Sequence, residues 1–491
     1  MKIVCVGGGP AGLYFAISAK LRDAGHEITI TERDPPGATY GWGVVCQDNL
    51  LDRLYRNDHE SAEKIRAAAA LWQEQEVILR GDQVAYLPGY GFSVSRARLL
   101  DVLTRRAADL GVGIHHHTGV EDVAAFADAD LVVAADGANS RVRQLHGDAF
   151  GTTLTYGRNP YIWLGTEKAF TSFTFAFEET PAGWIWCYGY PTSTGLSTFI
   201  VECPPETWQG LGLDSAGDED GVRLLEKIFE RALDGHALIS RSRGEPARWL
   251  RFAQVTNRSW QHDVVVLIGD AAHTTHFTMG QGTRLAVTDA MTLARLLSQH
   301  ETVPGALGVF DREGRAALRR IQAAARTGAA WFEHVDRYVD RDVVDFAYAM
   351  SGRQGSARPW RYQKHRATQV MPVRKARRTI HSGRRAYLAL RRGEPLASAL
   401  SVRPQRRRLA GYAAPLPPTT ALHEGALPER EGEAPNGRAS APRLVEPTGT
   451  GSVPPTRRDK AVTIAKNAAA GMTQRAPISN NDGVRRLGGS A

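Results

Sequence analysis

A glycine-rich turn between two apolar segments opens the sequence, and it limits the possible folds more than any other feature. Residues 3–6 have the composition of a buried strand, residues 13–21 have that of a helix, and residues 7–12 between them read Gly-Gly-Gly-Pro-Ala-Gly. Glycines in such a unit permit a tight bend, close approach of the backbone to a pyrophosphate, and close packing of the helix on the strand. Free backbone N–H groups and the positive helix end attract phosphates. The pattern predicts a dinucleotide-binding unit.

A carboxylate stands where such a unit needs one. A second predicted strand, residues 27–31, ends at Glu32, twenty residues after Gly12. A carboxylate at this place accepts hydrogen bonds from the ribose hydroxyls of an adenosine. A lone glycine pattern can also be a tight turn without a ligand. Here strand, glycines, helix, strand and acid follow one another in register, which favours the dinucleotide.

Two further turns follow apolar strands later in the chain. Residues 136–140 read Asp-Gly-Ala-Asn-Ser after the strand predicted at 130–135, and residues 269–273 read Gly-Asp-Ala-Ala-His after the one at 264–268. Open α/β sheets bind their ligands just beyond the carboxyl ends of the strands, where both aspartates stand. Residues 280–282, Gly-Gln-Gly, then precede a predicted helix. Each turn alone is ordinary; their order indicates FAD, held by one discontinuous domain.

Together these segments resemble the single-component flavoprotein aromatic hydroxylases over about residues 1–340. The resemblance implies that Asp136 is shared between FAD and the pyridine nucleotide. It also implies that Arg96, in the run Ser-Arg-Ala-Arg-Leu, approaches the flavin phosphates; the alternative is a solvated arginine at a helix start. The remaining FAD contacts that it implies are Gly7, Gly9, Pro10, Ala11, Gly12, Glu32, Asp270 and Gly280.

Four further runs narrow the resemblance. Residues 41–45, 156–163, 197–203 and 276–280 are similar to the branch that holds salicylyl-CoA 5-hydroxylase, the hydroxylase half of anthraniloyl-CoA monooxygenase/reductase and the violacein-pathway tryptophan hydroxylase. The wider family usually carries a proline shortly before the glycine turn that faces the flavin. This chain has Phe-Thr-Met at 277–279 instead, which agrees with the narrower branch.

The activity that the resemblance implies is ring hydroxylation by a flavin monooxygenase. NADH or NADPH, visiting transiently, would reduce FAD, O₂ would add at flavin C4a, and the hydroperoxide would transfer its distal oxygen to an electron-rich ring. The first-choice substrate is an aryl-CoA thioester, as for salicylyl-CoA 5-hydroxylase. The alternative is a free small aromatic, such as tryptophan or an intermediate of secondary metabolism. No protein group is identified as catalytic, because the chemistry needs no protein nucleophile.

An alternating aromatic pattern marks the segment between the second and third turns. Trp184, Trp186, Tyr188 and Tyr190 occupy one face of a predicted strand. In the family, such a sheet covers the reactive edge of the flavin. Trp186 and Tyr188 are therefore candidates for the substrate cavity, with core packing as the alternative. His276, after the third turn, is a candidate for active-site polarity or a structural hydrogen bond.

The predicted fold class is α/β, with a discontinuous Rossmann-like FAD-binding domain and an inserted sheet-rich substrate domain. We assign residues 1–150 and 256–345 to the first domain and residues 151–255 to the second. Residues 346–412 form a basic, partly helical extension. Residues 413–491 are rich in Pro, Gly, Ala and Ser and have little apolar periodicity, so they are expected to form a disordered tail.

Positive charge is concentrated at the C-terminal end. Residues 351–491 hold 27 Lys and Arg against 8 Asp and Glu, whereas the net charge of the whole chain is +9. The clusters at 374–378 and 406–408 fit nucleic acid, an acidic membrane surface or an anionic substrate. A solvated extension is the simpler interpretation, and we predict no specific nucleic-acid partner. Four arginines are either ligands of CoA phosphates or surface charges: Arg243, Arg248, Arg251 and Arg258.

Cysteine and histidine usage bears on compartment and metals. The four cysteines, at 5, 46, 187 and 203, show no metal-ligand or redox spacing and indicate reduced thiols of the cytoplasm. No uninterrupted apolar run approaches the roughly 18 residues of a membrane span. Adjacent histidines at 115–117 point in different directions and lack a further ligand at suitable spacing, so we predict no metal. The oligomeric state stays open.

Overall fold

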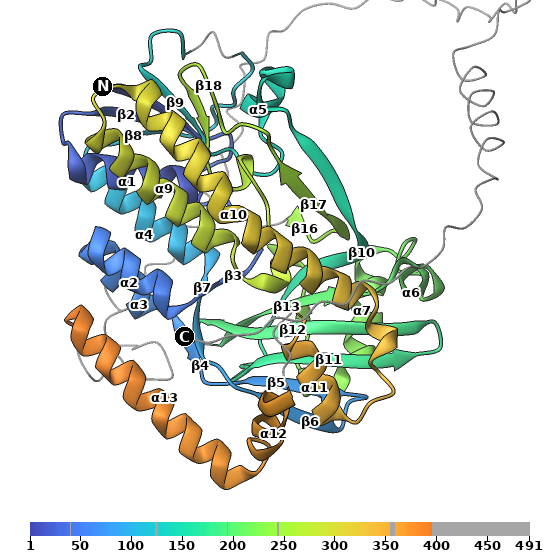
Figure 1. Ribbon diagram of the computed structural model, residues 1–491. Helices are drawn as coiled ribbons and strands as arrows, with labels where there is room; N and C mark the ends of the chain where they lie inside the picture. The colour runs from blue at the N-terminus through green and yellow to red at the C-terminus, as the bar shows by residue number, and fades with distance from the viewer. Residues whose placement is uncertain (40, 123–125, 194, 243–244, 354–358, 395–491) are drawn as a thin grey trace, which may run out of the picture. The chain divides into compact units, whose positions relative to one another are not determined.

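The computed structural model is a mixed α/β fold with parallel and antiparallel sheets (Figure 1). The predicted tail, 413–491, and the cluster at 406–408 lie outside the described residues. Within the described part, every helix is too short or too polar to cross a bilayer. The residues that the structure describes are 1–39, 41–122, 126–193, 195–242, 245–353 and 359–394.

A six-stranded sheet carries the three turns found in the sequence. Its order is β18-β19-β9-β1-β2-β8, and every pair is parallel except β18 with β19. The central strands are apolar runs buried on both faces, as in parallel sheets covered by helices. The strands are β1 (Lys2–Val6), β2 (Glu27–Thr31), β8 (Gly113–His115), β9 (Leu131–Ala134), β18 (Gln261–His262) and β19 (Val265–Leu267).

The helices that pack around this sheet include α1 (Pro10–Arg22), α4 (Arg96–Asp109) and α9 (Gly282–Gln299). Helices α1 and α9 run side by side in Figure 1 and pack extensively against each other. Proline at the first position of α1 suits the helix start, because its fixed φ is helical and its missing N–H would have no partner there. The carboxyl ends of β1, β9 and β19 therefore place all three turns at one edge of the sheet.

A larger, mostly antiparallel sheet has the order β14-β10-β13-β12-β11-β5-β6, with β17 also paired to β10. Strands β5 and β6 come from the sequence that we assigned to the FAD-binding domain, and β5 pairs in parallel with β11. The strands are β5 (Gln75–Leu79), β6 (Gln83–Leu87), β10 (Thr153–Thr166), β11 (Phe173–Thr180), β12 (Gly183–Ser193), β13 (Leu196–Glu202), β14 (Leu238–Ile239) and β17 (Leu250–Thr256).

The aromatic alternation predicted for β12 is confirmed. Trp186, Tyr188 and Tyr190 pack into one core, whereas Ile185 and Cys187 pack into another on the opposite face. The first core is closed by aromatic residues of α10 (Val303–Glu333) and α11 (Val343–Ser351). The second is closed by α7 (Asp218–Ile228) and α8 (Glu230–Leu233).

Helix α10 connects the cores of the two sheets. Leu307 and Phe310 in its first half belong to the core of the parallel sheet. Trp331 and Phe332 in its last turns belong to the core under β11 and β12. Because one continuous helix enters both cores, a displacement of either sheet would disturb the packing of the other.

The remaining elements border these layers. A three-stranded sheet has the order β3-β7-β4. Its strands are β3 (Gly43–Cys46), β4 (Ala70–Trp72) and β7 (Gly91–Ser95). The other helices are α2 (Asp48–Asn57), α3 (His59–Ala68), α5 (Arg141–Leu145), α6 (Pro205–Gly210), α12 (Pro359–Ala367) and α13 (Met371–Arg392). The short strands β15 (Arg241–Ser242) and β16 (Glu245–Pro246) pair with each other.

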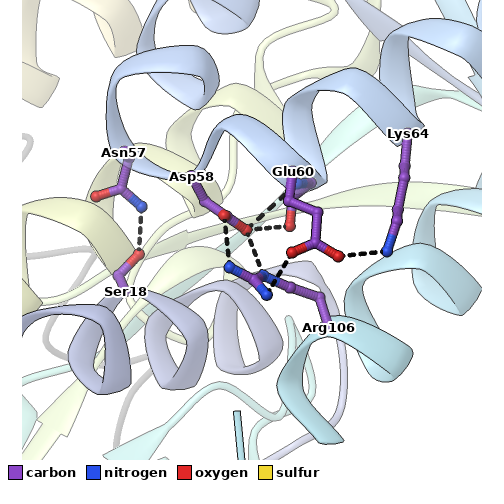
Figure 2. Close-up of polar contacts among 7 residues, drawn as sticks. Ser18, Asn57, Asp58, Glu60, Lys64 and Arg106 are labelled. Atoms are coloured by element: carbon purple, nitrogen blue, oxygen red, sulfur yellow. Dashed lines mark hydrogen bonds and ion pairs between the residues drawn. The ribbon is translucent and has the colours of Figure 1, made fainter. Parts of the chain in front are cut away.

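An ion-pair cluster fixes α3 against α4 (Figure 2). Arg106 of α4 donates from Nε and Nη2 to both carboxylate oxygens of Asp58, at 3.1 and 3.0 Å, and its Nη1 lies 2.6 Å from Glu60 Oε2. Asp58 is buried and also caps α3 by accepting from the Ser61 backbone N–H. Glu60 pairs further with Lys64. The cluster therefore holds a buried carboxylate that depends on one arginine.

The first prediction concerns Arg106→Leu, which leaves Asp58 buried without its cation. We expect the free energy of unfolding to fall by about 3 kcal/mol, because an uncompensated buried charge is costly. Arg105→Leu is the matched control: Arg105 pairs with Asp101 from a side chain that is 59% exposed, against 14% for Arg106. The control should change the value by less than about 1 kcal/mol. Urea unfolding measures both, and equal losses would contradict the prediction.

Candidate active site

Two glycines of the first turn are required by packing inside the protein. Gly7 has φ +107°, and a Cβ built on it would lie 2.5 Å from the carbonyl oxygen of Ala135. A Cβ on Gly12 would lie 2.1 Å from the carbonyl oxygen of Gly7. Gly7 also donates from its N–H to the carbonyl of Thr31, at 2.8 Å. Any side chain at either position would push α1 or β9 away from β1.

Gly9 differs, because a Cβ there would meet no described atom within 4 Å. It is the last residue before α1, which begins at Pro10 and continues with Ala11. Open space in front of a helix N-terminus, bordered by free N–H groups, fits a phosphate. The packing of the protein therefore does not require a glycine at position 9, whereas a ligand bound at this helix start would require one.

Glu32 is held directly behind this turn. Its Oε2 accepts from the Gly8 N–H at 2.7 Å, and its Oε1 accepts from the Asp34 N–H at 2.9 Å. The carboxylate is half-buried and keeps further acceptor capacity. The position fits the ribose role that its spacing indicated.

Asp136 closes the second turn and lies against the first. Its Oδ2 accepts from the backbone N–H groups of Arg141 and Val142, at 2.7 and 3.1 Å, which fixes the start of α5. Its Oδ1 is buried, and no described atom donates to it. Its Cα would lie 2.9 Å from a Cβ on Gly7. A buried acceptor of this kind needs a donor from a ligand or from water.

Side-chain and backbone contacts connect the third turn to the other two. A Cβ on Gly269 would lie 3.0 Å from the Cβ of Ala11. Arg143 donates from Nη1 to the carbonyl of Ala271 and from Nη2 to that of Ala138, at 2.7 and 2.5 Å. All three turns are therefore neighbours, as the sequence indicated.

The opposite charges of Asp270, in the third turn, and Arg96 act on each other. Asp270 is exposed to solvent, yet desolvation by the surrounding protein raises the pKa of its carboxyl, and the charges of His273 and Arg96 oppose this. Burial lowers the pKa of Arg96, and its Nε has no hydrogen-bond partner among the described residues. A buried guanidinium with a free donor fits an anion such as a phosphate.

Gly280 has φ +57° and ends a short 3₁₀ turn, Phe277–Met279. A Cβ on Gly280 would lie 3.8 Å from Cβ of Val45 on β3. Beside it, Gln281 Oε1 and Arg284 Nε are buried without partners in the described part of the chain. Sequence reasoning missed these two side chains; Gln281 stands within the Gly-Gln-Gly run before the helix, and Arg284 follows that run two residues later.

The proposed FAD residues therefore fit the cofactor on three observations. Gly9 leaves open space at a helix N-terminus. Three buried polar atoms, Asp136 Oδ1, Arg96 Nε and Gln281 Oε1, lack protein partners where the structure is described. Gly9 and these three atoms lie on or beside the elements that bring the three turns together. Their hydrogen-bond acceptors and donors are therefore available to the ribose, pyrophosphate and ring of one dinucleotide.

The structure places Trp186 and Tyr188 in the core. Trp186 Nε1 donates to the Tyr188 hydroxyl at 2.9 Å, and this hydroxyl donates to Glu202 Oε2 at 2.6 Å. Asn159 Nδ2 donates to Glu202 Oε1 at 2.9 Å. Their polar atoms are thus used within the protein. Of the two, Tyr188 also makes an edge contact with the ring of Phe277, with the ring centroids 5.7 Å apart.

Glu202 was not singled out from the sequence, because its burial depends on three strands meeting around it. It lies opposite Tyr161 of β10 and Trp186 of β12 in the strand register. Burial raises the pKa of Glu202 to about 7 despite its hydrogen bonds. Tyr161 contacts Phe277 with ring centroids 4.6 Å apart, and both Glu202 and Asp270 help to raise its pKa to about 12, after burial. Tyr161 therefore connects the buried carboxyl of Glu202, its neighbour in the strand register, with the ring of Phe277.

His276 lines a cavity of 260 Å³ between β10, β17 and α10, which we call the β10–β17 cavity. Its Nδ1 lies 2.9 Å from Thr278 Oγ1, and its ring stacks on Phe277. Burial lowers the pKa of His276 to about 4, so the ring is neutral at pH 7. Other lining residues are Tyr156, Gly157, Phe252, Gln254, Gln322 and Arg326.

Of the four arginines considered for CoA, Arg243 lies outside the described residues. Arg248, Arg251 and Arg258 are exposed. Arg251 donates from Nε to the carbonyl of Gly157 at 2.9 Å, so it stands beside the β10–β17 cavity. Among the described residues, no three His, Cys, Asp or Glu side chains are grouped to hold a metal ion.

Comparison with known proteins also indicates an FAD-binding protein. A family model described as "FAD binding domain" matches residues 1–326. Salicyloyl-CoA 5-hydroxylase of a Streptomyces species is 39% identical over 349 residues, which are 69% of this chain and 66% of that protein, just under two thirds of its length. The 3-hydroxy-4-methyl-anthranilyl-[aryl-carrier protein] 5-monooxygenase of Streptosporangium sibiricum is 36% identical over 380 residues, 76% of this chain and 100% of that protein.

A solved structure shows the same fold. The crystal structure of p-nitrophenol 4-monooxygenase from Pseudomonas putida superposes with a TM-score of 0.56 at 20% identity. It covers 72% of this chain and 94% of that one. At this identity the likeness concerns the fold alone.

The second prediction uses the contrast between two glycines. Gly9→Val places its side chain in open space, so the protein should fold with a nearly unchanged melting temperature but purify without flavin absorbance, because the valine occupies the phosphate position. Gly12→Val, whose Cβ meets the Gly7 carbonyl, should lower the melting temperature strongly. Flavin retained at wild-type occupancy in Gly9→Val would contradict this assignment.

The third prediction concerns Glu202→Gln. The folded pKa of Glu202 is raised to about 7 from an ordinary 4.5, so the folded state prefers the proton. The wild type should lose stability as pH rises from about 4.5 through 7, by at most roughly 3 kcal/mol, and the neutral glutamine removes this loss. Melting temperatures at pH 5 and pH 8 measure the difference. Glu206→Gln, on an exposed side chain, is the control; identical pH dependence of wild type and Glu202→Gln would refute the prediction.

Proposed function

The chain belongs to the FAD-binding-domain family of flavin-dependent monooxygenases, and from this membership we propose that it hydroxylates the ring of an aromatic acid held as a thioester. It is a flavin-dependent aromatic monooxygenase, and its cofactor is FAD. The thioester carrier in the proposal is CoA or a carrier protein. The proposed co-substrates are NADH or NADPH and O₂, and the proposed location is the cytoplasm, where the four buried thiols stay reduced.

One observation carries the thioester proposal. Two relatives at 36% and 39% identity are named for aromatic acids attached to a carrier, one for a CoA thioester and the other for an aryl-carrier protein. The match to the second extends over that protein's whole length. Because both relatives are named for substrates of this class, we infer the same substrate class for this chain.

We assign the cofactor as follows. The α1 N-terminus at Gly9 binds the pyrophosphate, Glu32 binds the adenosine ribose, and Arg96 neutralises phosphate charge. Asp136 and the turns at Asp270 and Gly280 complete the site, with Gly7, Pro10, Ala11 and Gly12 shaping the first turn. When bound and reduced, FAD activates O₂ for transfer of one oxygen atom to the ring.

The two sheets divide the work in this proposal. The six-stranded sheet with α1, α4 and α9 is the Rossmann-like FAD-binding domain, from residues 1–150 and 256–345. The larger sheet is the substrate domain, built on residues 151–255 and extended by β5 and β6. The aromatic face of β12 and the last turns of α10 exclude water from the ring.

The protein's own groups position the ring and its activating hydroxyl or amino group. Phe277 and the neutral His276 offer an apolar surface with one polar edge beside Gly280. Tyr161, between the Asp270 turn and Glu202, is the candidate for orienting the substrate's polar substituent. Glu202 holds or releases a proton near neutral pH in this arrangement.

The alternative function is hydroxylation of a free small aromatic, such as tryptophan or an intermediate of secondary metabolism. The observation that favours it is the size of the β10–β17 cavity, 260 Å³, which accommodates a ring without a long thioester arm. The exposed Arg251 beside this cavity favours an anionic arm instead.

The fourth prediction separates the two functions. The enzyme should hydroxylate salicyl and anthranilyl thioesters of CoA or pantetheine with kcat/KM at least tenfold above that of the free acids, because the arm adds binding energy outside the ring site. NAD(P)H oxidation and product mass measure each rate. Free salicylate or anthranilate turned over as efficiently as its thioester would overturn the thioester assignment in favour of the alternative.

A further inference from the structure

Helix α13 presents apolar side chains to solvent and arginines to the protein. Val373, Ile380, Tyr387 and Leu390 are 42, 70, 60 and 63% exposed. Arg374 and Arg385 on the same helix are buried. Helices on a protein surface usually show the reverse, with the apolar side turned to the core. The orientation of α13 therefore needs an explanation.

Ion pairs fix this orientation. Arg374 Nε lies 3.5 Å from Oε2 of the buried Glu74, and its guanidinium stacks 3.4 Å from the ring centroid of Tyr86. At the other end, Arg392 donates from Nε to Asp52 Oδ1 at 2.6 Å. Buried pairs are costly to break, because each leaves an uncompensated charge. The helix is thus held with its apolar face outward.

The exposed residues repeat every seven positions. Val373, Ile380 and Tyr387 are seven apart, and Ala376 and Gly383 follow the first two by three. Leu390 completes the pattern three residues after Tyr387, and we call these six residues the α13 stripe. Large and small side chains alternate from Val373 to Tyr387, and a Cβ on Gly383 would meet nothing within 4 Å in the described structure. Such knobs and holes are the contact pattern of helix on helix.

Charge selects the kind of helix. α13 contains eight Lys and Arg and no Asp or Glu. Lys375, Arg384 and Arg391 are exposed beside the stripe. A second copy of α13 would bring the same positive charge and be repelled, whereas an acidic helix would be attracted. The alternating small positions suit a helix better than the smooth surface of an anionic membrane.

Helix α13 is connected to the candidate site through α2 and β3. Arg392 of α13 pairs with Asp48 and Asp52 in α2. Helix α2 follows β3 directly, and Val45 of β3 faces Gly280. A protein bound on α13 therefore docks on a helix that α2 and β3 connect to the proposed flavin ring site.

We propose that the α13 stripe is the docking surface for an acidic carrier protein that delivers the aromatic thioester, with an acidic helix of the carrier lying along α13. This inference rests on the proposed function and deepens it by naming the carrier. The aromatic group itself enters the active site, so the enzyme must recognise the carrier elsewhere, and α13 offers apolar contact area flanked by cations.

The test compares one aromatic group on two carriers. The double variant Ile380→Glu/Tyr387→Glu, in the full chain with FAD, should lower kcat/KM at least tenfold, mainly through KM, for salicyl attached to an acidic aryl-carrier protein. It should leave salicyl-pantetheine within twofold of wild type. Leu21→Glu, an exposed apolar residue on α1, is the matched control and should change neither. Raised ionic strength should weaken only the carrier-protein reaction.

A binding measurement keeps the inference testable without turnover. Fluorescence anisotropy of the labelled carrier protein should show binding to wild type and at least tenfold weaker binding to the double variant. If wild type hydroxylates neither substrate, the proposed function fails while stripe-dependent binding still supports docking. Carrier binding or kcat/KM unchanged in the double variant would overturn the docking proposal. Three other results would also overturn it. The carrier binds only after residues 395–491 are removed, or the wild type forms a dimer that the double variant does not form. In the third, phosphatidylglycerol vesicles bind through the stripe while the carrier protein does not bind.

Discussion

The close approach of β1 to β9 is the constraint on which the rest of the structure depends. Gly7 fits only because it has no Cβ, since an added one would lie 2.5 Å from the carbonyl oxygen of Ala135. This approach sets Asp136 beside the glycine turn, and Arg143 then ties the second turn to the third. The carboxyl ends of three parallel strands thereby create one edge, where buried acceptors and donors gather that have no partner among the described residues.

The structure also depends on the core that α10 shares with β11 and β12. Phe332 stacks on Phe177 and Trp186, and the buried Tyr188 connects this core to both Phe277 and Glu202. A carboxyl with a pKa near 7 in such a place is destabilising when ionised. A carboxyl of this kind, connected through Tyr188 to Phe277, fits a proton-handling role at the expense of some stability.

Local geometry explains what could be predicted from the sequence. The glycine turns, their strands and the alternation of β12 depend on a few neighbouring residues, and all appear in the structure. The joining of β5 to β11, the enclosure of Glu202 and the outward face of α13 depend on partners far along the chain, such as Glu74 for Arg374. No periodicity reveals such pairings. Trp186 is an example. The face of β12 on which it lies could be predicted from the sequence, but its hydrogen bond to the Tyr188 hydroxyl in the core could not.

The central claim is that this family member inserts oxygen from O₂ into the ring of an aromatic thioester with the help of FAD. The most direct measurement is the mass of the hydroxylated thioester formed under ¹⁸O₂ with NAD(P)H. The account predicts one ¹⁸O atom in the new ring hydroxyl and no labelled product when FAD or NAD(P)H is left out. Oxygen derived from water, or product formation independent of the flavin, would contradict it.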